Sequence, residues 1–114
     1  PAQSAMAAPA DYQLEPVVAV VKNAPGAEIK VRLTHKPTGK PVGGAIVFRS
    51  RLDMSPENMA EHAAPVEPLP PVETGEFRFK ADFGMAGKWA LKLMVKVPGE
   101  NETIQGTVIF TAKD

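Results

Sequence analysis

Short runs in which apolar and polar residues alternate recur along the chain and predict β-strands. Between residues 28 and 34, aliphatic side chains of one parity alternate with charged side chains of the other. The same period of two recurs at residues 76–83, 89–97 and 104–110, and a valine-rich run covers residues 14–22. Because successive side chains of a strand point to opposite faces, the alternating runs predict strands with one buried face.

Residues 43–52 predict a further strand between two turn-rich segments. Its parity leads us to expect Ile46, Phe48 and Leu52 on the buried face.

Residues 53–71 interrupt this rhythm because they are rich in proline, which removes a backbone donor from a ladder. We expect a long irregular connection here, with one short helical turn that starts near Ser55 and ends by Ala64. A seventh strand is expected around residues 66–72. Long ordered loops in small domains commonly carry function, so this segment is the first place to look for a site.

A chain of 114 residues has room for one domain with one core. Short strands separated by regularly spaced turns indicate an all-β, two-sheet sandwich of about seven strands. We expect a loose N-terminal segment at residues 1–13 and a single β-sandwich domain at residues 14–114.

Charge and composition exclude several classes of function. Lys+Arg and Asp+Glu both number 13, so the formal net charge is zero, whereas nucleic-acid binders show a basic excess. No apolar run approaches the roughly 18 residues that span a bilayer. We therefore expect no nucleic-acid partner and no direct membrane insertion of this chain. The absence of cysteine excludes disulfides and thiolate ligands.

The first residues point to export. The chain starts with Pro1 rather than methionine, and the segment up to Ala10 is rich in small residues. This composition is typical of a mature start just after a removed export signal, although a trimmed chain would look the same. We expect a periplasmic or otherwise exported protein.

Enzyme signatures are missing from the sequence. It contains no glycine-rich phosphate loop, no nucleophile elbow and no paired-histidine zinc motif. Of the two histidines, His62 lies in the proline-rich segment, where an orienting partner is hard to supply, and His35 ends a strand. We expect no enzymatic activity.

Soft metal ligands are the most suggestive chemistry in the sequence. Met54, Met59 and His62 fall close together in the proline-rich segment, and Met85 lies in the turn at residues 84–87. Thioether and imidazole donors suit Cu(I), and thioethers bind without losing a proton. The alternative is that the methionines fill gaps at the edge of the core and that His62 is an ordinary surface residue. The spacing leaves both open.

Cationic side chains follow two of the predicted strands. Arg49 and Arg51 are expected to face outward on one strand, and Arg78 and Lys80 on another. If these strands are neighbours, the side chains form a basic stripe suited to an acidic partner. Otherwise they belong to solvated faces, paired with carboxylates in contacts that contribute little to stability.

Two stretches of the chain resemble FixH/YtkA-like domains. One comprises residues 31–34 and 37–42, and the other runs from residues 75–79 to the Gly-Met-Ala-Gly-Lys-Trp motif at residues 84–89. The resemblance covers residues 14–112. It implies an immunoglobulin-like β-sandwich of the Greek-key type outside the cytoplasm, in a family that often occurs in copper-handling contexts.

The resemblance also implies ligands and a role. Family members often carry methionines where this chain has Met54 and Met59 in one loop and Met85 in a turn, which implies a Cu(I) site with His62 as a fourth ligand. Two functions follow. The chain is expected to be a periplasmic domain that binds Cu(I) in copper handling. The alternative is a protein-interaction module that docks on an envelope efflux or assembly complex without binding metal.

Overall fold

The computed structural model of the protein describes residues 9–114. A short 3-10 turn, η2 (Pro9–Asp11), precedes the first strand, which begins at Tyr12. The folded domain therefore begins before residue 14, inside the segment that we expected to be loose, and residues 1–8 of that segment lie outside the described residues. Residues 9–114 contain no helix that is long and apolar enough to cross a membrane.

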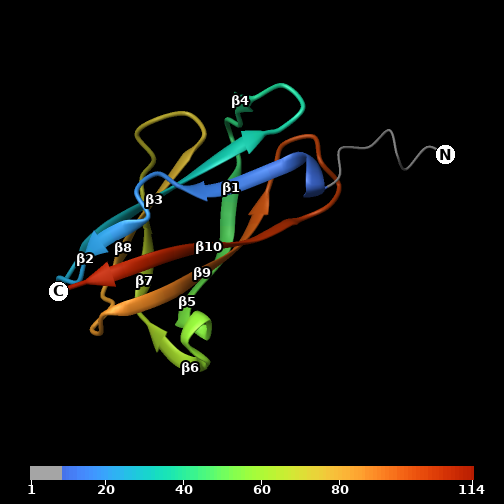
Figure 1. Cartoon of the computed structure of the whole chain (residues 1–114). Helices are drawn as coiled ribbons and strands as arrows, with labels where there is room; N and C mark the ends of the chain where they lie inside the picture. Colours follow the sequence, from blue (N-terminus) through green and yellow to red (C-terminus); the bar gives the residue numbers. More distant parts are fainter. Residues whose placement is uncertain (1–8) are drawn as a thin grey trace.

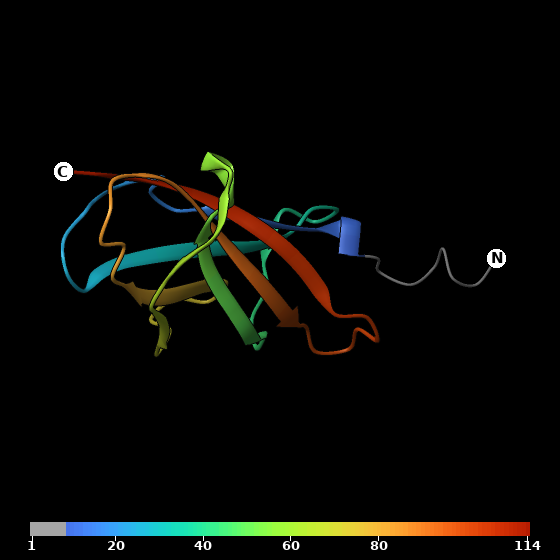
Figure 2. The ribbon, with the colours of Figure 1, turned by 90° about the horizontal axis from the view of Figure 1, so that it is seen from below.

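The fold is an all-β sandwich of two sheets (Figures 1 and 2). The first sheet contains, in spatial order, β1 (Tyr12–Pro16), β3 (Ala27–His35), β8 (Glu76–Ala81) and β7 (Val66–Leu69), with β4 (Lys40–Pro41) beside β3. The second contains β2 (Val20–Lys22), β10 (Ile104–Lys113), β9 (Gly87–Lys96), β5 (Ile46–Met54) and β6 (Met59–Ala64). This order matches immunoglobulin-like sandwiches. The predicted class is confirmed, with more strands than the seven expected.

The valine-rich run at residues 14–22 forms two strands rather than one. Pro16 ends β1, in keeping with the inability of proline to donate to a ladder. Residues 17–19 then bend, and β2 joins the second sheet, where it pairs in parallel with β10. The Thr111 N–H donates to the Ala19 carbonyl at 2.8 Å where this pairing starts. The N-terminal part of the domain therefore contributes to both sheets.

The proline-rich segment is mostly strand, so the predicted irregular connection is wrong. It folds into a 3-10 turn, η3 (Ser55–Glu57), followed by β6 and β7, and no helical turn continues to Ala64. None of its prolines lies in a central strand. Pro65 separates the two strands, and Pro68 lies in β7 at the border of the first sheet. The expected strand at residues 66–72 is confirmed as β7.

A β-bulge in β5 reverses the predicted facing of two residues. Phe48 is an extra residue between Val47 and Arg49, which pair with successive residues of β9. Ile46 and Phe48 are consequently 64% and 53% exposed, and the prediction that they face the core is wrong. Leu52, beyond the bulge, is buried as predicted.

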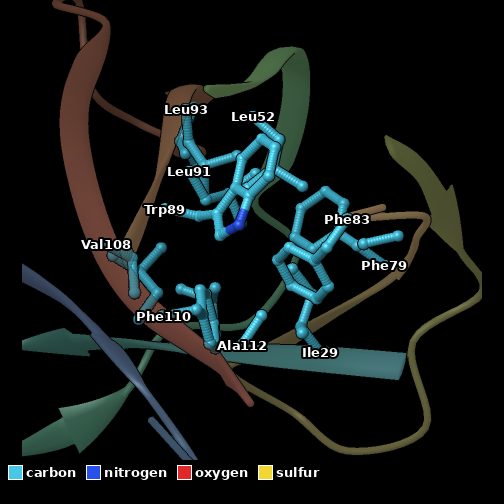
Figure 3. Packing of buried hydrophobic residues seen from close by; sticks show 14 of the residues in the cluster. Ile29, Leu52, Phe79, Phe83, Trp89, Leu91, Leu93, Val108, Phe110 and Ala112 are labelled. Carbon is cyan, nitrogen blue, oxygen red and sulfur yellow. The ribbon is translucent and has the colours of Figure 1, made fainter. Parts of the chain in front are cut away.

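Trp89 lies at the centre of the core. It is fully buried, and Figure 3 shows its indole ring among Leu52, Leu91 and Phe83. The centroids of the Phe83 and Trp89 rings lie 5.6 Å apart. Burying the indole N–H without a partner would be costly, and this group donates to the Met85 carbonyl at 3.0 Å. The core is thereby tied to the turn that precedes β9.

Gly75 offers a test of the close contact between β4 and the start of β8. Its φ is 81°, and a Cβ at this position would lie 2.5 Å from the Cβ of Pro41. Gly39 has a similar φ of 69° but open space around it. We expect Gly75→Ala to lower the free energy of unfolding by about 1–3 kcal/mol more than Gly39→Ala, because only the first adds a clash to the backbone strain. Urea unfolding measures this difference, and equal losses would contradict the close contact.

Candidate metal centre

The hairpin between β5 and β6 has local signals that fix its shape. The Ser55 N–H donates to the Asp53 side chain at 3.0 Å, and Pro56 supplies a backbone angle suited to the first turn of a helix. Asn58 ends the turn in the left-handed region, with φ of 60°, and its N–H donates to the Ser55 carbonyl at 3.0 Å. Met54 and Met59 therefore become direct partners across the two strands.

A shift of register in this hairpin places His62 against the core. Met54 pairs with Met59, but the preceding residue Asp53 pairs with Ala63, so residues 60–62 have no partner position on β5. The His62 ring lies 5.7 Å from the Trp89 ring, centroid to centroid, at an angle of 49°. The bulge thus brings an imidazole against the buried indole at the open edge of the sheet.

The turn before β9 packs against the tip of this hairpin. The Met54 Cε lies 2.8 Å from the position that a Cβ would take on Gly87. The Lys88 N–H donates to the Glu57 carboxylate at 2.9 Å, which ties η3 to the first residues of β9. Since the Met85 carbonyl accepts the Trp89 indole N–H, Met85 belongs to the same assembly.

The four predicted ligands therefore lie at one end of the sandwich, although they differ in exposure. Met54 is 1% exposed and belongs to the hydrophobic core. Met59 is half-buried and packs against the core, His62 is exposed, and Met85 is 42% exposed. The alternative of gap-filling methionines applies most directly to Met54, which pairs with Met59 across the hairpin.

The donor set fits a soft cation in its chemistry. Met54, Met59 and Met85 offer thioether sulfur, and His62 offers imidazole nitrogen, which are ligands suited to Cu(I). The indole of Trp89 adds an aromatic face next to His62, and such faces attract cations. Among residues 9–114, no three or more His, Cys, Asp or Glu side chains are placed to share a metal ion.

Asp53 is a buried carboxylate that holds the base of the hairpin. Its position in β5 places the side chain on the outer face of the sheet, and the residue is nevertheless fully buried. Arg51 and Lys92 approach its Oδ2 at 2.8 and 3.1 Å. Burial alone raises the pKa of Asp53, but hydrogen bonds from Ser55, Lys92 and Arg51 outweigh that effect and hold its pKa well below the ordinary value of 3.8.

Sequence reasoning named the four candidate ligands but missed the residues that position the segments carrying them. Asp53, Glu57 and Trp89 each connect the hairpin or the turn to the sheets. The same parity of Arg51 and Asp53 on one strand was a signal for their contact, since residues two apart share a face. No spacing rule links Glu57 to Lys88, which is distant in the sequence.

Comparison with known proteins gives one family match. Residues 6–94 match the family described as YtkA-like. This match supports the YtkA-like part of the resemblance, and the likeness to FixH stays a prediction. Among solved structures, the chain is similar to one named ZirS C-terminal Domain, with 9% identity, a TM-score of 0.48, and coverage of 96% of this chain and 70% of that chain. No curated protein matches.

The contacts of Asp53 predict an acid-sensitive fold. Because its pKa is lower in the folded chain than in the unfolded chain, its stabilisation is complete above the ordinary pKa of 3.8 and is lost as pH falls towards the folded value. We expect Asp53→Asn to lower the free energy of unfolding at neutral pH by about 1–3 kcal/mol.

This variant should also flatten the loss of stability between about pH 5 and pH 3. The control is Glu102→Gln, which alters an exposed carboxylate for which the structure shows no hydrogen bond or ion pair. Urea unfolding across this pH range measures both effects. A variant whose stability falls with acid as steeply as that of the wild type would contradict the role of Asp53.

Proposed function

The chain belongs to the YtkA-like family, and we propose that it is an exported, non-enzymatic domain that binds Cu(I) in copper handling. The observation that carries this proposal is that the β5–β6 hairpin, which holds Met54, Met59 and His62, packs against the turn before β9, which holds Met85. Trp89 contacts both segments, through the His62 ring and the Met85 carbonyl. In this role the chain receives Cu(I) and gives it to an envelope partner or a metal-efflux system.

The two hairpin methionines provide the core of the proposed site. Their pairing across β5 and β6 places two thioethers on one hairpin, which Asp53 and Glu57 fix to the sheets. Thioethers are neutral and bind Cu(I) without releasing a proton. Because Met54 is buried, the more exposed Met59 would meet an incoming ion first.

His62 and Met85 supply the accessible side of the proposed site. Both are exposed, and both are anchored to Trp89, one through its ring and the other through its backbone carbonyl. Ligands that remain accessible to solvent suit transfer of an ion to a partner better than long-term storage. A cation held by His62 would also lie close to the indole, whose fluorescence then reports binding.

An anaerobic Cu(I) titration against a competing chelator tests the proposal. Replacement of both hairpin methionines by leucine removes two sulfurs while nearly conserving side-chain volume, so the core should stay folded. We expect the wild type to retain Cu(I) and to show altered Trp89 fluorescence. Met54→Leu/Met59→Leu should bind at least about tenfold more weakly, since even outer-shell partners of a metal contribute roughly this factor.

Met94→Leu is the matched control because Met94 is a half-buried methionine on β9, away from the hairpin partners. It should bind Cu(I) as the wild type does. Circular dichroism and urea unfolding of all three proteins separate loss of ligands from loss of folding. Absence of Cu(I) binding by the wild type, or unchanged binding by a folded double variant, would falsify the proposal.

A further inference from the structure

The two outer faces of this neutral chain differ in how their charges are arranged. On the first sheet, cations and carboxylates alternate between neighbouring strands and pair with one another. The ion pairs join Arg78 to Glu28 at 2.9 Å, Arg32 to Glu76 at 3.5 Å and Lys80 to Glu67 at 3.8 Å. That face is therefore largely neutralised by its own side chains.

The outer face of the second sheet is cationic instead. Strand parity places on it Arg49 and Arg51 from β5, and Lys88, Lys92 and Lys96 from β9. The outward positions of β9 and β10 hold no carboxylate, and the one outward carboxylate of β5 is the buried Asp53.

Asp53 neutralises only part of this charge. Arg51 and Lys92 share this single carboxylate, and both side chains stay accessible, at 52% and 42%. Arg49 and Lys96 form no ion pair within the described part of the chain. The face therefore keeps an excess of accessible positive charge, although the whole chain is neutral.

The basic stripe that the sequence allowed, with β5 and β8 as neighbouring strands, does not form. Arg78 and Lys80 lie on β8, in the first sheet, so they are not neighbours of Arg49 and Arg51. The cations that join the two arginines come from β9, because β5 pairs with β9 in the second sheet.

The cationic face carries a groove. It is lined by Arg49, Arg51, Lys92, Met94, Gln105 and Thr107. Cationic donors come from β5 and β9, and the amide and hydroxyl of β10 add neutral polar groups opposite them. Ile46 and Ile109, which are 64% and 42% exposed, add apolar surface on the same outer face.

We propose that this groove is a docking surface for an extended acidic segment of a protein partner. Its cations match carboxylate side chains in charge, and the polar groups of Gln105 and Thr107 match the hydrogen-bonding needs of a peptide backbone. The inference is independent of Cu(I) binding, because none of the proposed metal ligands lines the groove.

Binding of a short fluorescein-labelled glutamate-rich peptide, followed by fluorescence anisotropy, tests this surface. A peptide with glutamine in place of every glutamate is the control probe. We expect the wild type to bind only the acidic peptide, with an affinity that falls as salt is raised. Arg49→Gln/Lys96→Gln removes two cations that form no ion pair, so the fold should persist. It should weaken binding by roughly threefold or more.

Lys30→Gln/Lys36→Gln is the matched variant, since it removes the same charge from exposed lysines on and beside β3, in the first sheet. It should bind the acidic peptide as the wild type does. The proposal is overturned if the wild type does not bind the peptide at low salt, or if both double variants lose affinity equally. Stronger binding to phosphatidylglycerol vesicles than to the peptide would overturn it as well.

Discussion

The need to satisfy one buried indole N–H organises the end of this protein that carries the candidate ligands. Trp89 gives the core its largest side chain, and its ring nitrogen donates to the Met85 carbonyl. That hydrogen bond fixes the turn before β9, against which the β5–β6 hairpin packs through Met54 and Glu57. The indole ring also contacts the ring of His62. A single core residue therefore sets the relative positions of two segments that carry every candidate ligand.

The second constraint is electrostatic, and it acts on the hairpin. A buried carboxylate is costly unless it is paired and hydrogen-bonded, and Asp53 meets both conditions. Its bonds to Ser55, Arg51 and Lys92 hold the turn, the strand and the neighbouring strand together. Arg51 also donates to the Ala60 carbonyl at 2.7 Å, so the irregular part of β6 is fastened to the same group. The hairpin is thus a positioned element, despite its prolines and its place at the sheet edge.

Much of the fold could be predicted from the sequence, because period-two runs such as residues 28–34 and 89–97 report burial directly. The facing of Ile46 and Phe48 could not, since one bulge residue reverses parity without any change in composition. Residues 53–71 were predicted to be irregular because proline disfavours a central strand. Proline content does not exclude a strand at the edge of a sheet, and β6 and β7 lie at such edges. The gathering of the ligands depends on contacts between segments distant in sequence, which local patterns do not encode.

The parallel pairing of β2 with β10 has a mechanical consequence. Val20 lies opposite Thr111 and Lys22 opposite Lys113, so the strands near the two ends of the domain run side by side in one direction. The start of β1 and the C-terminus lie at opposite ends of the molecule (Figure 1). Tension applied along this line loads the β2–β10 hydrogen bonds together, in shear, so that they must rupture at once. Antiparallel strands pulled apart from one end would instead unzip bond by bond. A domain tethered through both ends would therefore resist stretching better than its small size suggests.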